Sequence, residues 1–270
     1  MPELPEVETT VRGLAPVLHG RRIARVIANR PDLRRPLPPH LGQRLTGAVV
    51  TGLGRRAKYG LIHTDRGDTM VFHLGMSGRW RVDPSEALTH DHLVIETDEG
   101  RTLALNDPRR FGSVDLVPTA MLDDWGPFGA LGPEPLGKSF GGAHLARAFE
   151  GRAAPAKALL LDQRVVAGLG NIYVCEALHM AGIAPSRAGG RIGAKRLDLL
   201  AESVRSVLLA AIEAGGSTLR DYARPDGELG YFSKQWRVYG GEGQACECGT
   251  VIRRRVEGGR STFWCPRCQR

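Results

Sequence analysis

The sequence has no run of about 18 consecutive apolar residues, so we expect no membrane-spanning helix. Its first residues lack the basic and then apolar pattern of a secretory signal peptide. Internal repeats and low-complexity tracts are also missing. We therefore expect a cytoplasmic protein, and its 270 residues have room for two domains, or for one domain and a smaller module.

Acidic residues are too few to balance the basic ones. Lysine and arginine together number 37 and aspartate and glutamate 29, which gives a formal net charge of +8. This excess of positive charge favours a polyanionic partner, either nucleic acid or an acidic membrane surface.

Cysteine is scarce, and four of the five cysteines lie close together near the end of the chain: Cys246, Cys248, Cys265 and Cys268. In a reducing compartment such a cluster indicates metal ligation rather than disulfide bonds. Two pairs flank sixteen residues that alternate in polarity around two glycines, which predicts a β-hairpin held by one structural Zn²⁺ ion. The first pair is one residue closer than the usual spacing, and a redox pair is the alternative interpretation.

Hydrophobic periodicity predicts the fold of the first half. Apolar residues at Leu4, Val7, Val11, Leu14 and Leu18 form one stripe of an amphipathic helix. Short strand-like runs follow at 22–27, 45–53, 59–63, 69–74, 92–97, 102–105 and 113–117. Successive strands with no helices between them predict an antiparallel β-sandwich.

The second half is predicted to be helical. A segment rich in glycine and proline, 126–142, indicates a linker. Helical patterns follow at 143–150, 154–161, 171–181 and 192–214, and Cys175 within them is predicted to be a small buried apolar residue. The predicted fold is therefore α+β, with a sandwich domain at 1–125, a helical domain at 143–235 and the cysteine module at 236–270.

Pro2 and Glu3 at the start of the chain suggest a specific chemistry. If the initiator methionine is removed, Pro2 carries a free secondary amine, and an α-amino group with a pKa of about 8 is partly unprotonated at neutral pH. Such an amine can attack a sugar carbon and form an iminium, which acts as an electron sink. The alternative is an ordinary helix start, where proline is tolerated and glutamate is favoured.

Six segments, in order along the chain, together with the cysteine hairpin, resemble the formamidopyrimidine-DNA glycosylase family. They are residues 2–6, 55–59, 73–78, 106–112, 168–173 and 216–221, so the similarity covers essentially the whole chain. The resemblance implies a bacterial, nucleoid-associated base-excision repair enzyme that is monomeric. Its partner would be double-stranded DNA with oxidised bases or abasic sites, and no membrane partner is expected. It would excise oxidised purines, such as 8-oxoguanine and formamidopyrimidines, and then cut the strand as a lyase by β,δ-elimination.

The resemblance also implies catalytic roles. Pro2 would be the nucleophile at C1′ of the damaged nucleotide, and Glu3 would protonate the sugar ring oxygen, for which burial should raise its pKa. Lys58 would handle protons and phosphate, although a basic residue leading into a strand is the alternative. Arg260 of the hairpin would complete the catalytic set and also contact a phosphate.

Another set of residues would bind the DNA. Met76, Arg109 and Phe111 would fill the space left by the everted base, although Met76 and Phe111 could instead be core residues. The remaining DNA-binding residues implied by the resemblance are Glu6, His90, Lys157 and Asn171. A helix-two-turns-helix element at 154–181 would bind phosphates, and the loop at 217–237 would close over 8-oxoguanine. A metal role for His90 with His92 is not expected.

Two other functions remain open. One is an endonuclease VIII-type glycosylase for oxidised pyrimidines, against which Leu4 and the long loop at 217–237 argue. The other is a non-catalytic protein that binds damaged DNA, against which the joint presence of Pro2, Glu3 and Lys58 argues.

Overall fold

The computed structural model describes residues 2–217, 225–228 and 230–270, and the chain forms two compact units. Unit 1 comprises Met1–Gly129 and Ile212–Ser233, and unit 2 comprises Ala130–Ala211 and Lys234–Arg270. Among the described residues, no helix is long and apolar enough to cross a bilayer. Met1, whose removal is predicted, and part of the predicted lesion loop at 217–237 lie outside the described residues.

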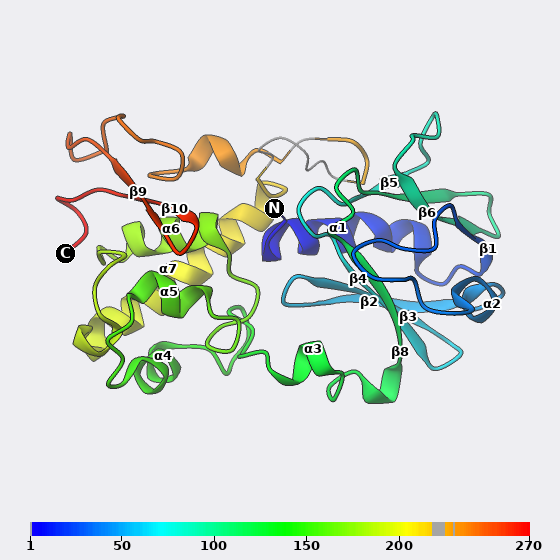
Figure 1. Ribbon diagram of the computed structural model, residues 1–270, viewed down its shortest axis with the longest axis horizontal. Helices are drawn as coiled ribbons and strands as arrows, with labels where there is room; N and C mark the ends of the chain where they lie inside the picture. The colour runs from blue at the N-terminus through cyan, green and yellow to red at the C-terminus, as the bar shows by residue number, and fades with distance from the viewer. Residues whose placement is uncertain (1, 218–224, 229) are drawn as a thin grey trace. The chain divides into compact units, whose positions relative to one another are not determined.

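Unit 1 contains two four-stranded antiparallel sheets (Figure 1). One has the order β1-β6-β7-β5, formed by Ile23–Ala28, Asp91–Thr97, Thr102–Asn106 and Arg79–Val82. The other has the order β2-β3-β4-β8, formed by Val50–Arg56, Tyr59–Thr64, Asp68–His73 and Ser113–Pro118. Leu93 and Leu105 of the first sheet share one buried core with Ile62 and Phe72 of the second, which confirms the predicted sandwich.

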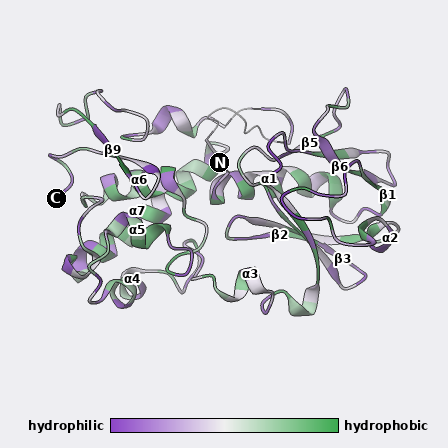
Figure 2. Cartoon of the chain, in the orientation of Figure 1, coloured by the Kyte–Doolittle hydropathy of each residue, from purple (hydrophilic) through white to green (hydrophobic). Residues whose placement is uncertain are grey.

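Helix α1 (Leu4–Leu18) packs against this core through the predicted stripe. The five stripe residues are all buried, at most 7% exposed, while polar residues occupy other positions of the helix (Figure 2). Proline near the first helical position and a capping box between Glu3 and Glu6 define where the helix begins. Burial of the stripe therefore fixes the position of Pro2 and Glu3, which directly precede it.

The strand predicted at 45–53 is wrong at its start. Leu45 ends the short helix α2 (Leu41–Leu45), and the chain then turns at Gly47, whose φ is +84°, before β2 begins at Val50. Strand β5 was not predicted, because its four residues contain two arginines and resemble a loop. The short helices η1 (Thr119–Met121) and α3 (Gly126–Gly129) follow β8.

Unit 2 contains the four predicted helices and the hairpin. The helices are α4 (Gly142–Phe149), α5 (Ala156–Leu161), α6 (Asn171–Met180) and α7 (Ala194–Glu213), with the 3₁₀ helix η2 (Gly189–Arg191). The last two residues of α7 and the first two of the 3₁₀ helix η3 (Phe232–Gln235) belong to unit 1. The hairpin strands β9 (Arg253–Glu257) and β10 (Arg260–Trp264) meet at the predicted glycine turn. Cys175 of α6 is fully buried, as predicted, in a core shared with Ile252 and Phe263. The hairpin is therefore packed onto α6.

Candidate catalytic and DNA-binding site

The start of α1 gathers three predicted site residues, Pro2, Glu3 and Glu6. All three are buried, Glu3 at 2% and Glu6 at 1% exposed. One oxygen of the Glu6 carboxylate, Oε2, accepts the N–H of Glu3 at 2.8 Å, and the other, Oε1, accepts the N–H of Ser217 at 2.8 Å. Glu6 therefore holds the residue next to Pro2 and the first residue of the predicted lesion loop at the same time.

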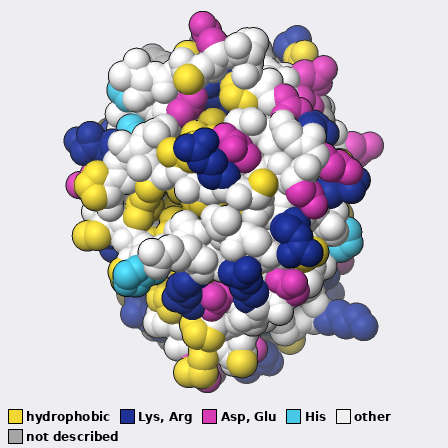
Figure 3. All heavy atoms as spheres, turned by 90° about the vertical axis from the view of Figure 1, so that its right-hand side faces the viewer, with side chains coloured by type: hydrophobic (Ala, Val, Ile, Leu, Met, Phe, Trp, Pro, Cys, Tyr) yellow, Lys and Arg dark blue, Asp and Glu magenta, His cyan; other side chains and the backbone are white. Residues whose placement is uncertain are grey.

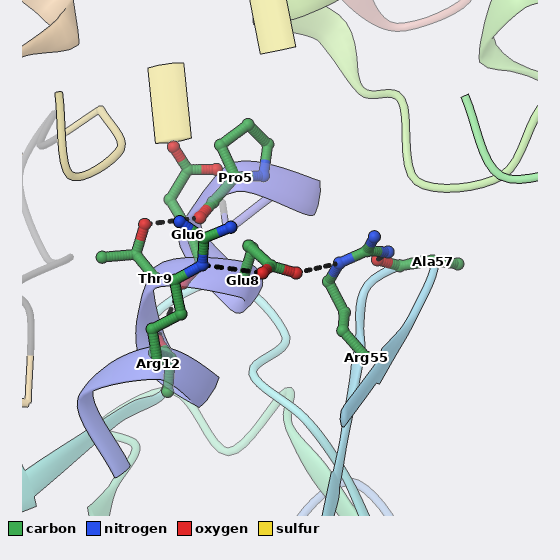
Figure 4. A network of polar contacts seen from close by, with 8 residues as sticks. Pro5, Glu6, Glu8, Thr9, Arg12, Arg55 and Ala57 are labelled. Carbon is green, nitrogen blue, oxygen red and sulfur yellow. Dashed lines mark hydrogen bonds and ion pairs between the residues drawn. The ribbon is translucent and has the colours of Figure 1, made fainter. Parts of the chain in front are cut away.

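Lys58 lies in the turn between β2 and β3, and Arg55 near the end of β2 attaches this turn to α1 (Figure 4). The side chain of Arg55 in β2 is only 9% exposed, and its Nε donates to Oε2 of Glu8 in α1 at 3.0 Å. Nη1 of Arg55 donates to the carbonyl of Ala57 at 2.9 Å, and Ala57 has a φ of +53°. Because this guanidinium joins α1 to the residue before Lys58, the catalytic candidates Pro2 and Lys58 lie on elements that are connected.

His73, the last residue of β4, has a pKa that its surroundings lower. Burial, and to a lesser extent the charges of Lys58, Arg34 and Arg35, lower the pKa of His73 to about 4. The ring is therefore neutral near pH 7, and its Nδ1 accepts the N–H of Gly75 at 3.0 Å. This hydrogen bond supports the segment that carries Met76.

Met76, Arg109 and Phe111 come together although two separate segments carry them. The guanidinium carbon of Arg109 lies 4.8 Å from the centre of the Phe111 ring. Met76 is 36% and Phe111 43% exposed, which excludes the core alternative for both side chains. A Cβ atom on Gly75 would lie 2.3 Å from the carbonyl carbon of Phe111, so the two backbones are in direct contact.

His90 is exposed just before β6, and its carbonyl accepts the N–H of Asp107 at 3.0 Å. Its ring centre lies 5.9 Å from that of the buried His92. Among the described residues, the cysteine cluster is the only group of histidine, cysteine and acidic side chains found with metal-binding geometry. The structure thus offers no support for a metal site at the histidine pair.

In unit 2, Lys157 and Asn171 meet at one carbonyl group, that of Ser261, the residue after Arg260. Nζ of Lys157 and Nδ2 of Asn171 both donate to the carbonyl of Ser261, at 3.1 and 2.9 Å, and Ser261 follows Arg260 in β10. Asn171 is also the first residue of α6, the end of the helix at which the helix dipole favours an anion. The arrangement can hold adjacent phosphates of a DNA strand.

A cavity of about 400 Å³ opens beside this group. Lys157 and Arg260 line it together with the acidic residues Asp162 and Glu257. Lys157 is 3% exposed, and burial lowers the pKa of its ammonium group. Two of its three N–H donors bind Ser261 and Thr262, so one donor is left for a phosphate.

The four clustered cysteines fit a zinc ion. Their sulfur atoms all lie within 4.8 Å of one another, with 3.9 Å between Cys246 and Cys268 and 3.5 Å between Cys248 and Cys265. Zinc–sulfur bonds of about 2.3 Å in a tetrahedron require separations of this size. The shortened first pair therefore brings its sulfurs to the site. Nε2 of His179 in α6 lies 3.4 Å from the sulfur of Cys246 and can donate to it.

Charge is mixed on the face of unit 1 that Figure 3 shows, where basic and acidic side chains lie side by side. Unit 1 also contains ion pairs such as Arg21 with Glu99, at 2.5 Å, and Arg44 with Asp68. Such pairs contribute little to stability, but they cancel the field that would attract a polyanion.

Three buried polar groups of these regions were not found from the sequence. They are Ser217, which binds Glu6, Asp107, which lies between the segments of Met76 and Phe111, and Glu176, whose carboxylate accepts the backbone N–H groups of residues 237, 238 and 239. Asp107 and Ser217 lie inside segments that resemble the family, 106–112 and 216–221, and this position was the only sign in the sequence that they could matter. Glu176 lies only three residues after such a segment.

Family models match most of the chain. The model described as "Formamidopyrimidine-DNA glycosylase N-terminal domain" matches residues 1–114, and the "Formamidopyrimidine-DNA glycosylase H2TH domain" matches residues 131–223. The "Zinc finger found in FPG and IleRS" matches residues 246–270. The three models follow one another in the order in which the sandwich, the helices and the hairpin occur.

Whole proteins are also similar to this chain over its full length or nearly so. The formamidopyrimidine-DNA glycosylases of Rhizorhabdus wittichii and Novosphingobium aromaticivorans are 76% and 70% identical to the chain over 270 residues, with complete coverage of both partners. A solved structure of the Lactococcus lactis enzyme with DNA containing an abasic site has a TM-score of 0.92 at 33% identity and covers both chains completely. The Thermus thermophilus protein has a TM-score of 0.89 at 40% identity, covering 99% of this chain and 98% of its own.

Proposed function

The chain belongs to the formamidopyrimidine-DNA glycosylase family, and on that premise we propose that it removes oxidised purines from duplex DNA through a covalent bond to Pro2. It is a base-excision repair enzyme, a DNA glycosylase with abasic-site lyase activity, and it carries one structural zinc ion. The observation that carries the proposed chemistry is the burial of Pro2, Glu3 and Glu6 together at the start of α1.

In the proposed reaction, the nitrogen of Pro2 attacks C1′ of the damaged nucleotide. Glu3 gives a proton to the ring oxygen of the sugar, the base leaves, and the bond between nitrogen and C1′ becomes an iminium. Loss of a C2′ proton then returns electrons to the iminium and expels the 3′ phosphate, and a second elimination expels the 5′ phosphate. Lys58, on the turn tied to α1 by Arg55, handles protons and phosphate in these steps, and Arg260 completes the set.

The DNA is held at two places in this proposal. Lys157, Asn171 and Arg260 bind phosphates beside the lesion, supported by the hydrogen bonds of Lys157 and Asn171 to Ser261 and by the cavity that Lys157 and Arg260 both line. Met76, Arg109 and Phe111 fill the space that the everted base leaves, supported by the exposure of the two apolar side chains.

Other predicted residues keep supporting roles. Glu6 and His90 assist in binding the damaged strand, and residues 217–237 close over 8-oxoguanine. Duplex DNA of the nucleoid is the proposed partner, and a monomer is the proposed state. In this proposal, residues 1–125 carry out catalysis, residues 143–235 and 236–270 bind DNA, and residues 126–142 form a linker.

A comparison of two substrates tests the function. The purified enzyme is expected to nick a duplex with 8-oxoguanine opposite cytosine faster than one with thymine glycol. Pro2→Gly should lose most base excision and keep duplex binding, since the phosphate contacts lie elsewhere. Faster nicking of the thymine-glycol duplex would contradict the purine assignment, and no nicking of either duplex would contradict the glycosylase function.

A further inference from the structure

Asp107 is a buried carboxylate between the two segments that carry the inserting side chains. It follows β7 and has no exposed surface. Its Oδ1 accepts the hydroxyl of Ser77 at 2.7 Å, and its Oδ2 accepts the N–H of Gly112 at 2.8 Å. One carboxylate therefore binds the segment of Met76 with one oxygen and the segment of Phe111 with the other.

The Ser77 hydroxyl extends this connection. Besides donating to Asp107, its oxygen accepts the N–H of Arg109 at 3.2 Å. The carbonyl of Asp107 accepts the N–H of Arg110 at 3.1 Å and a hydrogen bond from Nε2 of His92 at 3.0 Å. The backbone on both sides of Arg109 is thus held by the same small group of buried atoms.

Backbone shape reinforces the connection. Gly75, with a φ of +61°, has no room for a side chain, because a Cβ atom would lie 2.5 Å from the nitrogen of Gly112. Arg110 adopts a φ of +54°, which is unfavourable for a residue with a side chain and requires support from its surroundings. Independent movement of the two segments would break these hydrogen bonds and close contacts, and would therefore raise the free energy of the protein.

We propose that Asp107 is a positioning residue that joins the segments 75–78 and 109–112 into one rigid body, so that Met76, Arg109 and Phe111 enter the DNA together. The side chains of Met76, Arg109 and Phe111 contact the DNA, and Asp107 acts only by positioning them. This inference rests on the proposed function of these three side chains. Its physical basis is the value of a prearranged site, because misplacing a group by about 1 Å can reduce a rate about 100-fold.

The test uses full-length Asp107→Asn and Ser77→Ala enzymes with two substrates. The first is a duplex with 8-oxoguanine, from which a base must be everted and its place filled. The second is a single strand with a preformed abasic site, which has no base to evert and no partner strand. Asp91→Asn is the matched control, because Asp91 is also a buried carboxylate, 4% exposed, whose side chain binds Arg81, Asn106 and the N–H of Leu88 but neither of the segments 75–78 and 109–112.

Asp107→Asn should slow single-turnover nicking of the duplex at least about tenfold and change cleavage of the single strand less than about twofold. 2-Aminopurine opposite the lesion reports insertion directly, and its fluorescence change should slow by the same factor as duplex nicking. The control should lower the unfolding temperature and leave the ratio of the two rates unchanged. Because Asp107 and Ser77 act through one network, the double variant should lose little more than Asp107→Asn alone.

An unchanged ratio of the two rates for Asp107→Asn, or an unchanged rate of the fluorescence step, would overturn the inference. Fully additive effects of the two substitutions would do the same. If Asp107→Asn does not fold, the ratio measured for Ser77→Ala decides the question. Failure of the unaltered enzyme to nick the lesion duplex would instead refute the proposed function, so the two failures are distinguishable.

Discussion

Replacement of Glu6 by glutamine tests whether the start of α1 is held as described. In the native protein, the two carboxylate oxygens accept the N–H groups of Glu3 and Ser217, both at 2.8 Å and both in a buried environment. Glutamine keeps one acceptor and replaces the other by an amide that faces an N–H donor. Since a hydrogen bond to a charged group contributes about 1.5–3 kcal/mol, we expect a loss of at least about 2 kcal/mol of stability.

This loss should lower the unfolding temperature by about 4–8 °C, at about 2–4 °C per kcal/mol. Misplacement of Pro2 and Glu3 should reduce single-turnover nicking of an 8-oxoguanine duplex about 100-fold. Differential scanning calorimetry and a gel-based nicking assay measure the two effects, with the exposed Glu86→Gln as control. An unfolding temperature and a nicking rate that both equal those of the unaltered enzyme would refute the role of Glu6.

Three further predictions concern other parts of the molecule. Because His73 is buried and neutral, the free energy of unfolding should fall by up to about 3 kcal/mol as the pH decreases from about 6.5 to about 4, since only the unfolded chain binds the proton over that range. His73→Phe should flatten this part of the curve of unfolding free energy against pH, measured by urea unfolding, and an unchanged curve would contradict the prediction. Cys265→Ser should lose zinc, measured by metal analysis, and bind duplex DNA weakly. Cys175→Ala, a change at a buried cysteine outside the cluster, should keep zinc, and normal DNA binding by Cys265→Ser would contradict the role of the hairpin. Arg260→Ala should reduce the slope of log affinity against log salt by about one, measured by fluorescence anisotropy, and Arg21→Ala should not; equal slopes for all three proteins would count against a phosphate contact.

The parts of the fold that follow from periodicity and spacing could be predicted from the sequence. The stripe of α1 placed Pro2 and Glu3 just before a packed helix, and the cysteine spacing around Gly258-Gly259 predicted the hairpin. The start of β2 could not be located, because the apolar residue Leu45 before it ends α2. Strand β5 was missed because two of its residues are arginines.

Polar contacts between distant segments could not be predicted. Glu6 and Ser217 are separated by 211 positions, and Ser77 and Asp107 by 30, so no periodic pattern connects either pair. Their partners are determined by how the strands and loops are brought together in three dimensions. The resemblance marked the segments that contain these residues, but only the structure shows which atoms meet.

The most direct test of the account is the mass of the enzyme after reaction with an 8-oxoguanine duplex in the presence of sodium borohydride. Reduction should convert the iminium into a stable amine, and peptide mapping should find the DNA remnant on an N-terminal peptide that begins with Pro2 and lacks Met1. An enzyme that keeps Met1, or carries an acyl group on Pro2, and still nicks the lesion strand at full rate would contradict the central claim.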